Sequence, residues 1–126
     1  MTDAQQDSSL GRVLVIEDDE DTRLFVEDLL TMSGYAVVGA ACGQEGLAAA
    51  NVPVDVILLD RRLPDADGIE LCRRLREQRG NEIPVIFLTA DRSPQLETEA
   101  RAAGATDFLH KPFPPDALLE RLARLA

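Results

Sequence analysis

The chain has few of the residues that build metal–sulfur sites and disulfide frameworks. Its 126 residues include two cysteines, Cys42 and Cys72, one histidine, His110, and a single lysine, Lys111. The cysteines lack metal-ligand spacing and the histidine has no partner cluster, which argues against a zinc site. We therefore expect both cysteines to be reduced and buried in a cytoplasmic protein.

Positive charge and long hydrophobic runs are also scarce. The formal net charge of −10 argues against direct nucleic-acid binding by this chain, because a phosphate backbone requires a basic protein face. No apolar run approaches the roughly 20 residues that span a membrane, so we expect no membrane association. Residues 1–9 are polar and acidic, unlike a signal peptide. We expect a disordered leader at 1–10 and one domain at 11–126.

Five short apolar runs alternate with helical patterns, which predicts repeated βα units and a parallel sheet. The predicted strands lie at 12–16, 36–40, 54–59, in a run opened by Pro84, and at 107–110. The runs are apolar without alternation, as in strands that helices cover on both faces. Right-handed crossovers then favour an α/β fold: a doubly wound five-stranded parallel sheet of order 2-1-3-4-5 in a flavodoxin-like three-layer sandwich.

The segments between the predicted strands carry apolar residues at helical spacing. The faces predicted to pack on the sheet contain Phe25, Val26, Leu29 and Leu30; Leu47, in a short helix over 44–50; Ile69, Cys72 and Leu75; Leu96, Ala100 and Ala103; and Leu118, Leu119, Leu122 and Leu125. Asp19 and Asp21 precede the first helical face, where carboxylates cap free N–H groups.

Polar side chains follow four of the five predicted strands. They are Glu17 and Asp18 after the first, Asp60 after the third, Thr89 after the fourth and Lys111 after the fifth. Parallel strands bring these ends to one edge of the sheet, which is where ligands bind in doubly wound folds. The three carboxylates and one ammonium have a formal charge of −2, which suits a divalent cation with hard oxygen ligands, Mg²⁺ or alternatively Mn²⁺. The backbone carbonyl of Arg62 is the simplest further ligand.

Asp60 is the candidate nucleophile of this site. A carboxylate can attack phosphorus and form an aspartyl phosphate. Phosphoryl transfer depends mainly on positioning and charge neutralisation, which the cation and Lys111 would supply, while Thr89 donates a hydrogen bond. Each of these residues alone also has an ordinary explanation as a cap, a turn residue or a solvated charge. Their joint placement at strand ends favours the site.

These residues lie in stretches that resemble the receiver domain of two-component response regulators. The stretches are VLVIEDDED, VDVILLDRRLPDADG, IPVIFLTA and AGATDFLHKPF, and the resemblance extends from Arg12 to Leu125. It implies that Asp60 is phosphorylated by a histidine kinase or a phosphotransfer protein. It also implies that Glu17 and Asp18 help to hold Mg²⁺, that Thr89 and Lys111 contact the phosphoryl group, and that the Lys111–Pro112 peptide is cis.

The resemblance further implies a phosphoacceptor that assists only its own phosphorylation and dephosphorylation, rather than an enzyme. Phosphorylation would draw Thr89 inward, and Phe108 would rotate into the space vacated. The surface of the fourth helix, fifth strand and fifth helix would then change and engage an output domain or effector protein. The physical basis is a new dianion whose hydrogen bonds exist in only one of two conformers.

The sequence departs from common family patterns in two respects, the first at Arg62 and Asp91 and the second at Glu97. Arg62 lies two residues after Asp60, and Asp91 lies two residues after Thr89. We expect Arg62 and Asp91 to approach each other, hinder the attacking water and so tune the phosphoryl lifetime. Glu97 stands near where receivers fused to winged-helix DNA-binding domains carry arginine.

Glu97 argues against the ion-paired dimer face of those receivers, although Asp107 and Arg121 match that face. Weak dimerisation therefore stays open.

Two other classes of protein compete with this interpretation. A phosphatase of the haloacid dehalogenase type also uses strand-end carboxylates and magnesium, but it needs a second aspartate where this chain has Arg62. A receiver-like binding module that is never phosphorylated is the second alternative. The sequence leaves open the cognate kinase, the regulated process, and whether this is a stand-alone regulator or a domain of a longer protein.

Overall fold

Strands and helices alternate throughout residues 10–125, the part of the chain that the computed structural model describes. The strands are β1 (Arg12–Ile16), β2 (Ala36–Ala40), β3 (Val56–Leu59), β4 (Val85–Thr89) and β5 (Asp107–His110). The helices are α2 (Glu20–Met32), α3 (Gly43–Ala49), α4 (Gly68–Arg79), α5 (Pro94–Ala102) and α6 (Pro115–Arg124). The expected leader at 1–10 lies outside the described residues except for Leu10, whose N–H donates to the Gly34 carbonyl at 2.8 Å.

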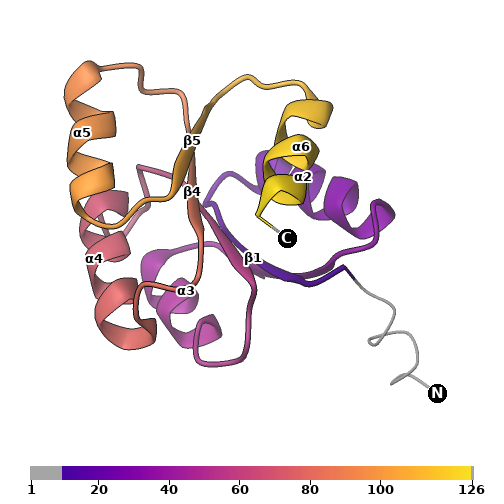
Figure 1. The fold of residues 1–126 in the computed structure, drawn as a ribbon, viewed down its shortest axis with the longest axis horizontal. Helices are drawn as coiled ribbons and strands as arrows, with labels where there is room; N and C mark the ends of the chain where they lie inside the picture. Colours follow the sequence, from indigo (N-terminus) through magenta and orange to yellow (C-terminus); the bar gives the residue numbers. More distant parts are fainter. Residues whose placement is uncertain (1–9, 126) are drawn as a thin grey trace.

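The five strands form one parallel sheet in the order β2-β1-β3-β4-β5, which confirms the predicted topology. Helices α3, α4 and α5 cover one face of this sheet, and α2 and α6 cover the other (Figure 1). Ile16 is in register with Leu59, and Leu59 with Phe87. The carboxyl ends of β1, β3 and β4 therefore lie at the same edge.

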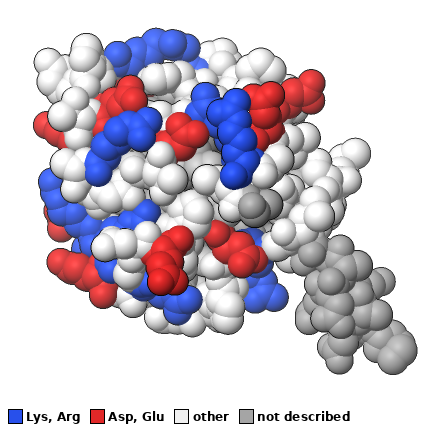
Figure 2. All heavy atoms as spheres, viewed as in Figure 1, with Lys and Arg blue, Asp and Glu red and all other residues white. Residues whose placement is uncertain are grey.

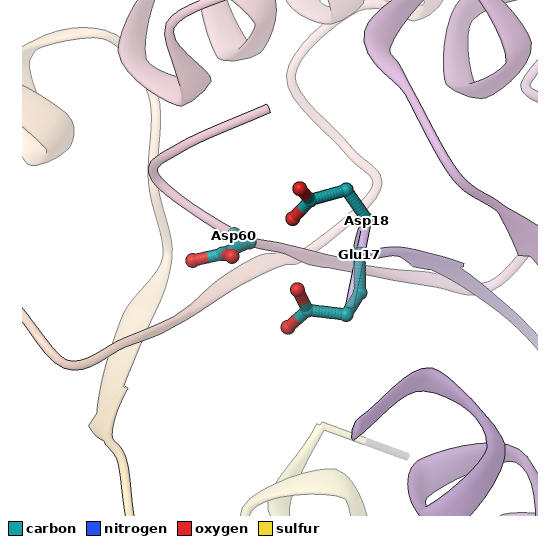
Figure 3. Close-up of side chains that lie close together, drawn as sticks. All are labelled: Glu17, Asp18 and Asp60. Atoms are coloured by element: carbon teal, nitrogen blue, oxygen red, sulfur yellow. The ribbon is translucent and has the colours of Figure 1, made fainter. Parts of the chain in front are cut away.

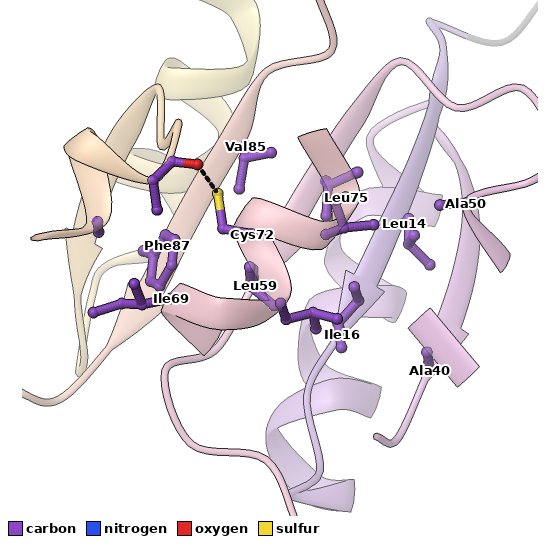
Figure 4. Packing of buried hydrophobic residues seen from close by; sticks show 14 of the residues in the cluster. Leu14, Ile16, Ala40, Ala50, Leu59, Ile69, Cys72, Leu75, Val85 and Phe87 are labelled. Atoms are coloured by element: carbon purple, nitrogen blue, oxygen red, sulfur yellow. Dashed lines mark hydrogen bonds between the residues drawn. The ribbon is translucent and has the colours of Figure 1, made fainter. Parts of the chain in front are cut away.

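The core has one layer on each face of the sheet, because successive strand residues point to opposite faces. Leu14 and Ile16 of β1 belong to the layer under α3, α4 and α5, whereas Val13 and Val15 belong to the layer under α2 and α6. Cys72 is fully buried in the first layer, and its thiol lies 3.5 Å from the Ala103 carbonyl (Figure 4).

The prediction that both cysteines are buried is correct for Cys72 and wrong for Cys42. Cys42 is only half-buried, because it occupies the N-cap position of α3 at the edge of the sheet. Helix α3 begins at Gly43, one residue before the predicted start. The Asp65 carboxylate from the loop after β3 explains this start, since it accepts hydrogen bonds from the N–H groups of Gly43 and Gln44 at 2.7 and 2.9 Å.

Other boundaries follow local hydrogen bonding. Asp19 caps α2 by accepting a hydrogen bond from the Thr22 N–H at 2.8 Å, as its position before the helix predicted. Strand β3 begins at Val56 rather than at 54. Gly34 follows the end of α2 with a φ of 103°, a conformation that glycine adopts at little cost.

The surface combines both signs of charge. On the face shown in Figure 2, acidic and basic side chains are interspersed and form no continuous basic surface. Among the helices within residues 10–125, none combines the length and the apolar character that crossing a bilayer requires.

Candidate functional site

Three carboxylates meet at the carboxyl edge of the sheet. Glu17 and Asp18 follow β1 and Asp60 follows β3, and one oxygen of each lies within 4.8 Å of the others (Figure 3). The sheet enforces this proximity, because the Asp60 N–H donates to the Ile16 carbonyl at 3.1 Å. The structure therefore brings together the three carboxylates that the sequence proposed as metal ligands.

The cluster runs from the interior of the protein to the solvent. Glu17 is 4% exposed, Asp60 is half-buried and Asp18 is exposed. Burial raises the pKa of Glu17 from 4.5 to about 7, and the neighbouring Asp60 charge adds to this effect, although Lys111 opposes both. Negative charge is thus in excess at a site that is partly shielded from water.

Lys111 is the cation of the cluster. Its ammonium donates a hydrogen bond to the Glu17 carboxylate and lies 3.5 Å from Asp60 Oδ2. Burial alone would lower the pKa of Lys111, but the Glu17 hydrogen bond and the Asp60 charge outweigh it and the pKa is raised. The Lys111–Pro112 peptide is cis, as the family resemblance implied.

The backbone after β3 fixes the orientation of Asp60. The Arg61 N–H donates to Asp60 Oδ1 at 2.7 Å, while Oδ2 faces Lys111. The loop that follows closes when the Gly68 N–H donates to the Arg61 carbonyl at 2.6 Å. A Cβ on Gly68 would lie 2.4 Å from the Asp60 carbonyl oxygen, so this close approach requires glycine.

Thr89 and Phe108, the two expected switch residues, are both buried. The Thr89 hydroxyl oxygen accepts a hydrogen bond from the Asp91 N–H at 3.1 Å. The Phe108 ring stacks on Phe87 with 5.3 Å between ring centroids and 12° between ring planes. Phe108 therefore lies inside the protein in this structure, and its expected rotation on phosphorylation stays a prediction.

Arg61, not Arg62, makes the ion pair with Asp91. The pKa of Asp91 is lowered mainly by hydrogen bonds from Ser93 and further by the charges of Arg61 and Arg62, so Arg62 does lie near Asp91, as expected, but without an ion pair. Arg61 Nη1 lies 3.4 Å from Asp91 Oδ2, whereas no ion pair of Arg62 is found in the described part of the chain. The exposed Arg62 instead forms a backbone bridge with Asp67 across the loop. Sequence reasoning missed Arg61, since the choice between two adjacent arginines depends on how this loop closes. Whether Arg62 or Asp91 tunes the phosphoryl lifetime stays a prediction.

Glu97 is paired within its own chain. Its carboxylate lies 3.1 Å from Arg101 Nε, and Arg121 Nη1 lies 2.9 Å from Asp107 Oδ2. The three residues singled out for the dimer face therefore take part in ion pairs on the surface of α5, β5 and α6.

The donor set fits the divalent cation that the sequence analysis expects. Carboxylate oxygens are the hard ligands that Mg²⁺ prefers. The three carboxylates and Lys111 leave a formal charge of −2, since −3 and +1 are the contributions of the two kinds of group. A divalent cation at this position would neutralise that excess.

The structure is a doubly wound α/β fold with an acidic cluster at the carboxyl edge of its sheet, and comparison with known proteins identifies its family. The family model described as the response regulator receiver domain matches residues 13–123. The chain therefore belongs to the receiver domain family of two-component response regulators. This membership sets aside the haloacid dehalogenase alternative.

The relatives with curated descriptions are longer proteins. The chain is 39% identical over 111 residues to the uncharacterized transcriptional regulatory protein YrkP of Bacillus subtilis, matching 88% of this chain and 47% of YrkP. It is 40% identical over 118 residues to the DNA-binding dual master transcriptional regulator RpaA of Synechocystis, matching 92% of this chain and 49% of RpaA. The chain thus spans about half the length of the curated relatives it matches.

Solved structures of receivers have the same fold. Chemotaxis protein CheY4 of Vibrio cholerae is 37% identical with a TM-score of 0.89, over 94% of this chain and 100% of CheY4. The BeF3-activated DrrB receiver domain is 33% identical with a TM-score of 0.84, over 91% of this chain and 96% of that one. Response regulators of this family partner with histidine kinases and output domains.

Proposed function

We propose that this chain acts in the cytoplasm and that Asp60 accepts a phosphoryl group from the phosphohistidine of a histidine kinase or phosphotransfer protein. The observation that carries this proposal is the position of Asp60: its Oδ2 lies 3.5 Å from the Lys111 ammonium inside a cluster of three carboxylates. This arrangement places a nucleophilic oxygen beside a cation that can neutralise phosphoryl charge.

The chemistry is a displacement at phosphorus. A carboxylate oxygen of Asp60 forms the new O–P bond while the N–P bond of the donor imidazole breaks, and that nitrogen keeps the electron pair. Lys111 neutralises a phosphoryl oxygen as a point charge, and the Thr89 hydroxyl donates to another. Glu17, Asp18, Asp60 and the Arg62 carbonyl would hold Mg²⁺, or Mn²⁺ in its place, which supplies further charge neutralisation.

Phosphorylation then acts as a switch. The phosphoryl group adds about −1.5 to −2 charges and three acceptor oxygens beside Thr89. Moving a two-state population from 1:99 to 99:1 needs about 5.5 kcal/mol of differential stabilisation. A few charge-assisted hydrogen bonds of roughly 1.5–3 kcal/mol each are sufficient for this. Thr89 and Phe108 transmit the change to the surface formed by α5, β5 and α6.

That surface would engage an output domain or a separate effector protein. The relatives' greater length supports an output domain outside this chain, and the name of RpaA describes that protein as DNA-binding. The net charge of −10 supports a division in which this chain does not itself bind nucleic acid. Within the site, Arg62 and Asp91 would tune how long the phosphoryl group survives.

Incubation with acetyl phosphate and Mg²⁺ tests the proposal. Intact-mass spectrometry should show the gain of one phosphoryl group, which chelation of the metal and the variant Asp60→Asn both abolish. Asp28→Asn, an exposed carboxylate on α2, is the matched control and should be phosphorylated like the wild type.

Other outcomes would support the alternatives. If the wild type gains no phosphoryl group while its fold and Mg²⁺ binding are intact, the chain is a binding module that keeps the receiver fold. If acetyl phosphate is consumed with many turnovers, Asp60 is not a simple phosphoacceptor.

A further inference from the structure

The side chain of Arg61 links two loops that flank the candidate site. Its Nη1 lies 3.4 Å from Asp91 Oδ2 in the loop after β4, and its Nε lies 3.0 Å from Asp67 Oδ1 at the start of α4. Its backbone N–H donates to Asp60 Oδ1 at 2.7 Å. One residue therefore contacts the phosphoacceptor through its backbone and the loop after Thr89 through its side chain.

Asp91 carries this link onward to Thr89. The Asp91 N–H donates to the Thr89 hydroxyl oxygen at 3.1 Å, and Asp91 Oδ1 accepts from the Ser93 N–H at 2.9 Å. The Thr89 hydroxyl thus uses its oxygen as an acceptor and retains its proton for donation. Any inward movement of Thr89 must either break the bond to Asp91 or move Asp91 with it.

The Arg61–Asp91 ion pair is partly shielded from solvent. The exposed fractions of the two side chains are 24% and 23%. Arg61 Nε is buried and makes no hydrogen bond of acceptable geometry among the described residues, although Asp67 lies close to it. A shielded pair is screened less than a surface pair, so it contributes more to holding the two loops together.

We infer that Arg61 is a positioning residue for the phosphoryl chemistry of Asp60. Its guanidinium clasps Asp91, and this clasp holds the loop after β4 and the Thr89 hydroxyl in their resting positions. The inference deepens the proposed function and rests on it. It assigns to Arg61, the residue next to Asp60, the role of holding the loop after β4. Neither Arg62 nor the residues at the strand ends supply that role.

The clasp and the acceptor chemistry should separate on mutation. Arg61→Ala keeps the backbone N–H that donates to Asp60 Oδ1, so Asp60 should still gain one phosphoryl group from acetyl phosphate. The same variant frees the loop that follows Thr89, so water should reach the phosphoryl group more easily and its lifetime should shorten about fivefold, as for an interaction of this strength. A general structural defect would lower both quantities together.

Amide hydrogen exchange of the unphosphorylated protein is the primary test. Exchange at the Asp91 N–H should be about fivefold faster in Arg61→Ala than in the wild type, because the loop opens more often. Arg61→Lys should restore part of the protection, since it keeps the charge. Arg92→Ala is the matched control, because Arg92 is exposed in the same loop and forms no ion pair within the described residues, and it should leave exchange unchanged.

Unchanged exchange at Asp91 in Arg61→Ala would overturn the inference, and so would an equal effect of Arg92→Ala. Because this readout needs no phosphate, it is independent of whether Asp60 is phosphorylated. Absence of any phosphoryl gain in the wild type would reject the proposed function while exchange still reports on the clasp. A lifetime that stays the same in Arg61→Ala, with faster exchange, would limit the clasp to structure and reject its role in the chemistry.

Discussion

A basic side chain lies at each end of the sheet, and the two side chains have different kinds of partner. At the carboxyl edge, Lys111 faces the carboxylates of Glu17 and Asp60. At the amino end of β4 and β5, Arg76 faces backbone carbonyls: Nε and Nη2 donate to Gly104 O at 3.1 and 2.6 Å, and Nη1 donates to Gly80 O and Ile83 O at 3.2 and 2.5 Å.

The difference separates a cation that faces neutral groups from a cation that faces an excess of negative charge. Carbonyl groups of the backbone are neutral and fixed, so Arg76 serves them as a hydrogen-bond donor and no negative charge collects around it. The carboxylates around Lys111 outnumber it, which leaves negative charge that a metal ion can neutralise. Substitutions at the amino end should therefore cost stability, whereas substitutions at the carboxyl edge should cost phosphorylation.

The largest expected effect on stability is that of Arg76→Ala. This change removes the donors that join the end of α4 to the turns before β4 and β5, and it leaves the carbonyls of Gly104 and Ile83 without them. We expect the free energy of unfolding to fall by about 3 kcal/mol, since charge-assisted hydrogen bonds contribute about 1.5–3 kcal/mol each and some carbonyls regain water. Urea unfolding monitored by circular dichroism measures this change.

Arg73→Ala on the same helix is the control for that measurement. Arg73 pairs with Glu70 at 3.1 Å, but the side chains are 53% and 59% exposed, and such pairs contribute little. Its substitution should change the free energy of unfolding by less than about 0.5 kcal/mol. Equal effects of the two variants would mean that the hydrogen bonds of Arg76 to backbone carbonyls do not stabilise the fold more than an exposed ion pair does.

Asp60→Asn should have a smaller effect of the opposite sign. In the absence of divalent cations, this substitution removes repulsion with Glu17 and Asp18 and one attraction to Lys111, so the net change favours the folded state. We expect the free energy of unfolding to rise by about 1 kcal/mol. Unfolding in EDTA measures this gain.

Adding Mg²⁺ should then reverse the ranking, because the wild type has one more carboxylate with which to bind the ion. Greater stability of the wild type than of Asp60→Asn in EDTA would contradict the view that the cluster holds uncompensated charge.

Much of this arrangement was predictable from sequence, because strand order and strand ends depend on local patterns. The apolar runs gave all five strands, and the polar residues that follow them gave Glu17, Asp18 and Asp60, which the sheet brings together. Their positions needed no knowledge of side-chain packing. Residues directly after parallel strands meet wherever the strands are neighbours.

The incorrect predictions concern residues whose positions depend on loop conformation. Arg62 was the arginine expected to approach Asp91, but the ion pair with Asp91 is made by Arg61, which the closure of the loop at Gly68 places opposite it. The burial of Cys42 was overestimated, because its position before α3 depends on capping by Asp65 from a distant loop. Contacts between two loops depend on turn geometry, which periodicity does not encode. The hydrogen bonds from Arg76 to the carbonyls of Gly80, Ile83 and Gly104 were not predicted for the same reason.

The smallest expected effect on stability concerns Asp65, a carboxylate at the carboxyl edge of the sheet that is not part of the cluster of Glu17, Asp18 and Asp60. Hydrogen bonds from the Gly43 and Gln44 N–H groups lower its pKa below 3.8, whereas burial raises the pKa of Glu17 at the same edge. A carboxyl group with a lowered folded-state pKa stabilises the protein above its unfolded pKa, and this stabilisation is lost as the pH falls through the folded value.

Asp65→Asn should therefore be less stable than the wild type by a constant margin above about pH 5, and the margin should shrink as the pH falls below about 4. Urea unfolding of both proteins across this range measures the margin, with Asp28→Asn as a control that removes an exposed carboxylate from α2. A margin that persists undiminished at the lowest pH would show that the Asp65 charge contributes nothing and that shape alone holds α3 against the loop. A margin that disappears would show that the Asp65 charge stabilises the fold through its two N–H donors. Glu17 and Asp60 differ from Asp65 because their neighbours include other carboxylates, which leave negative charge at the cluster.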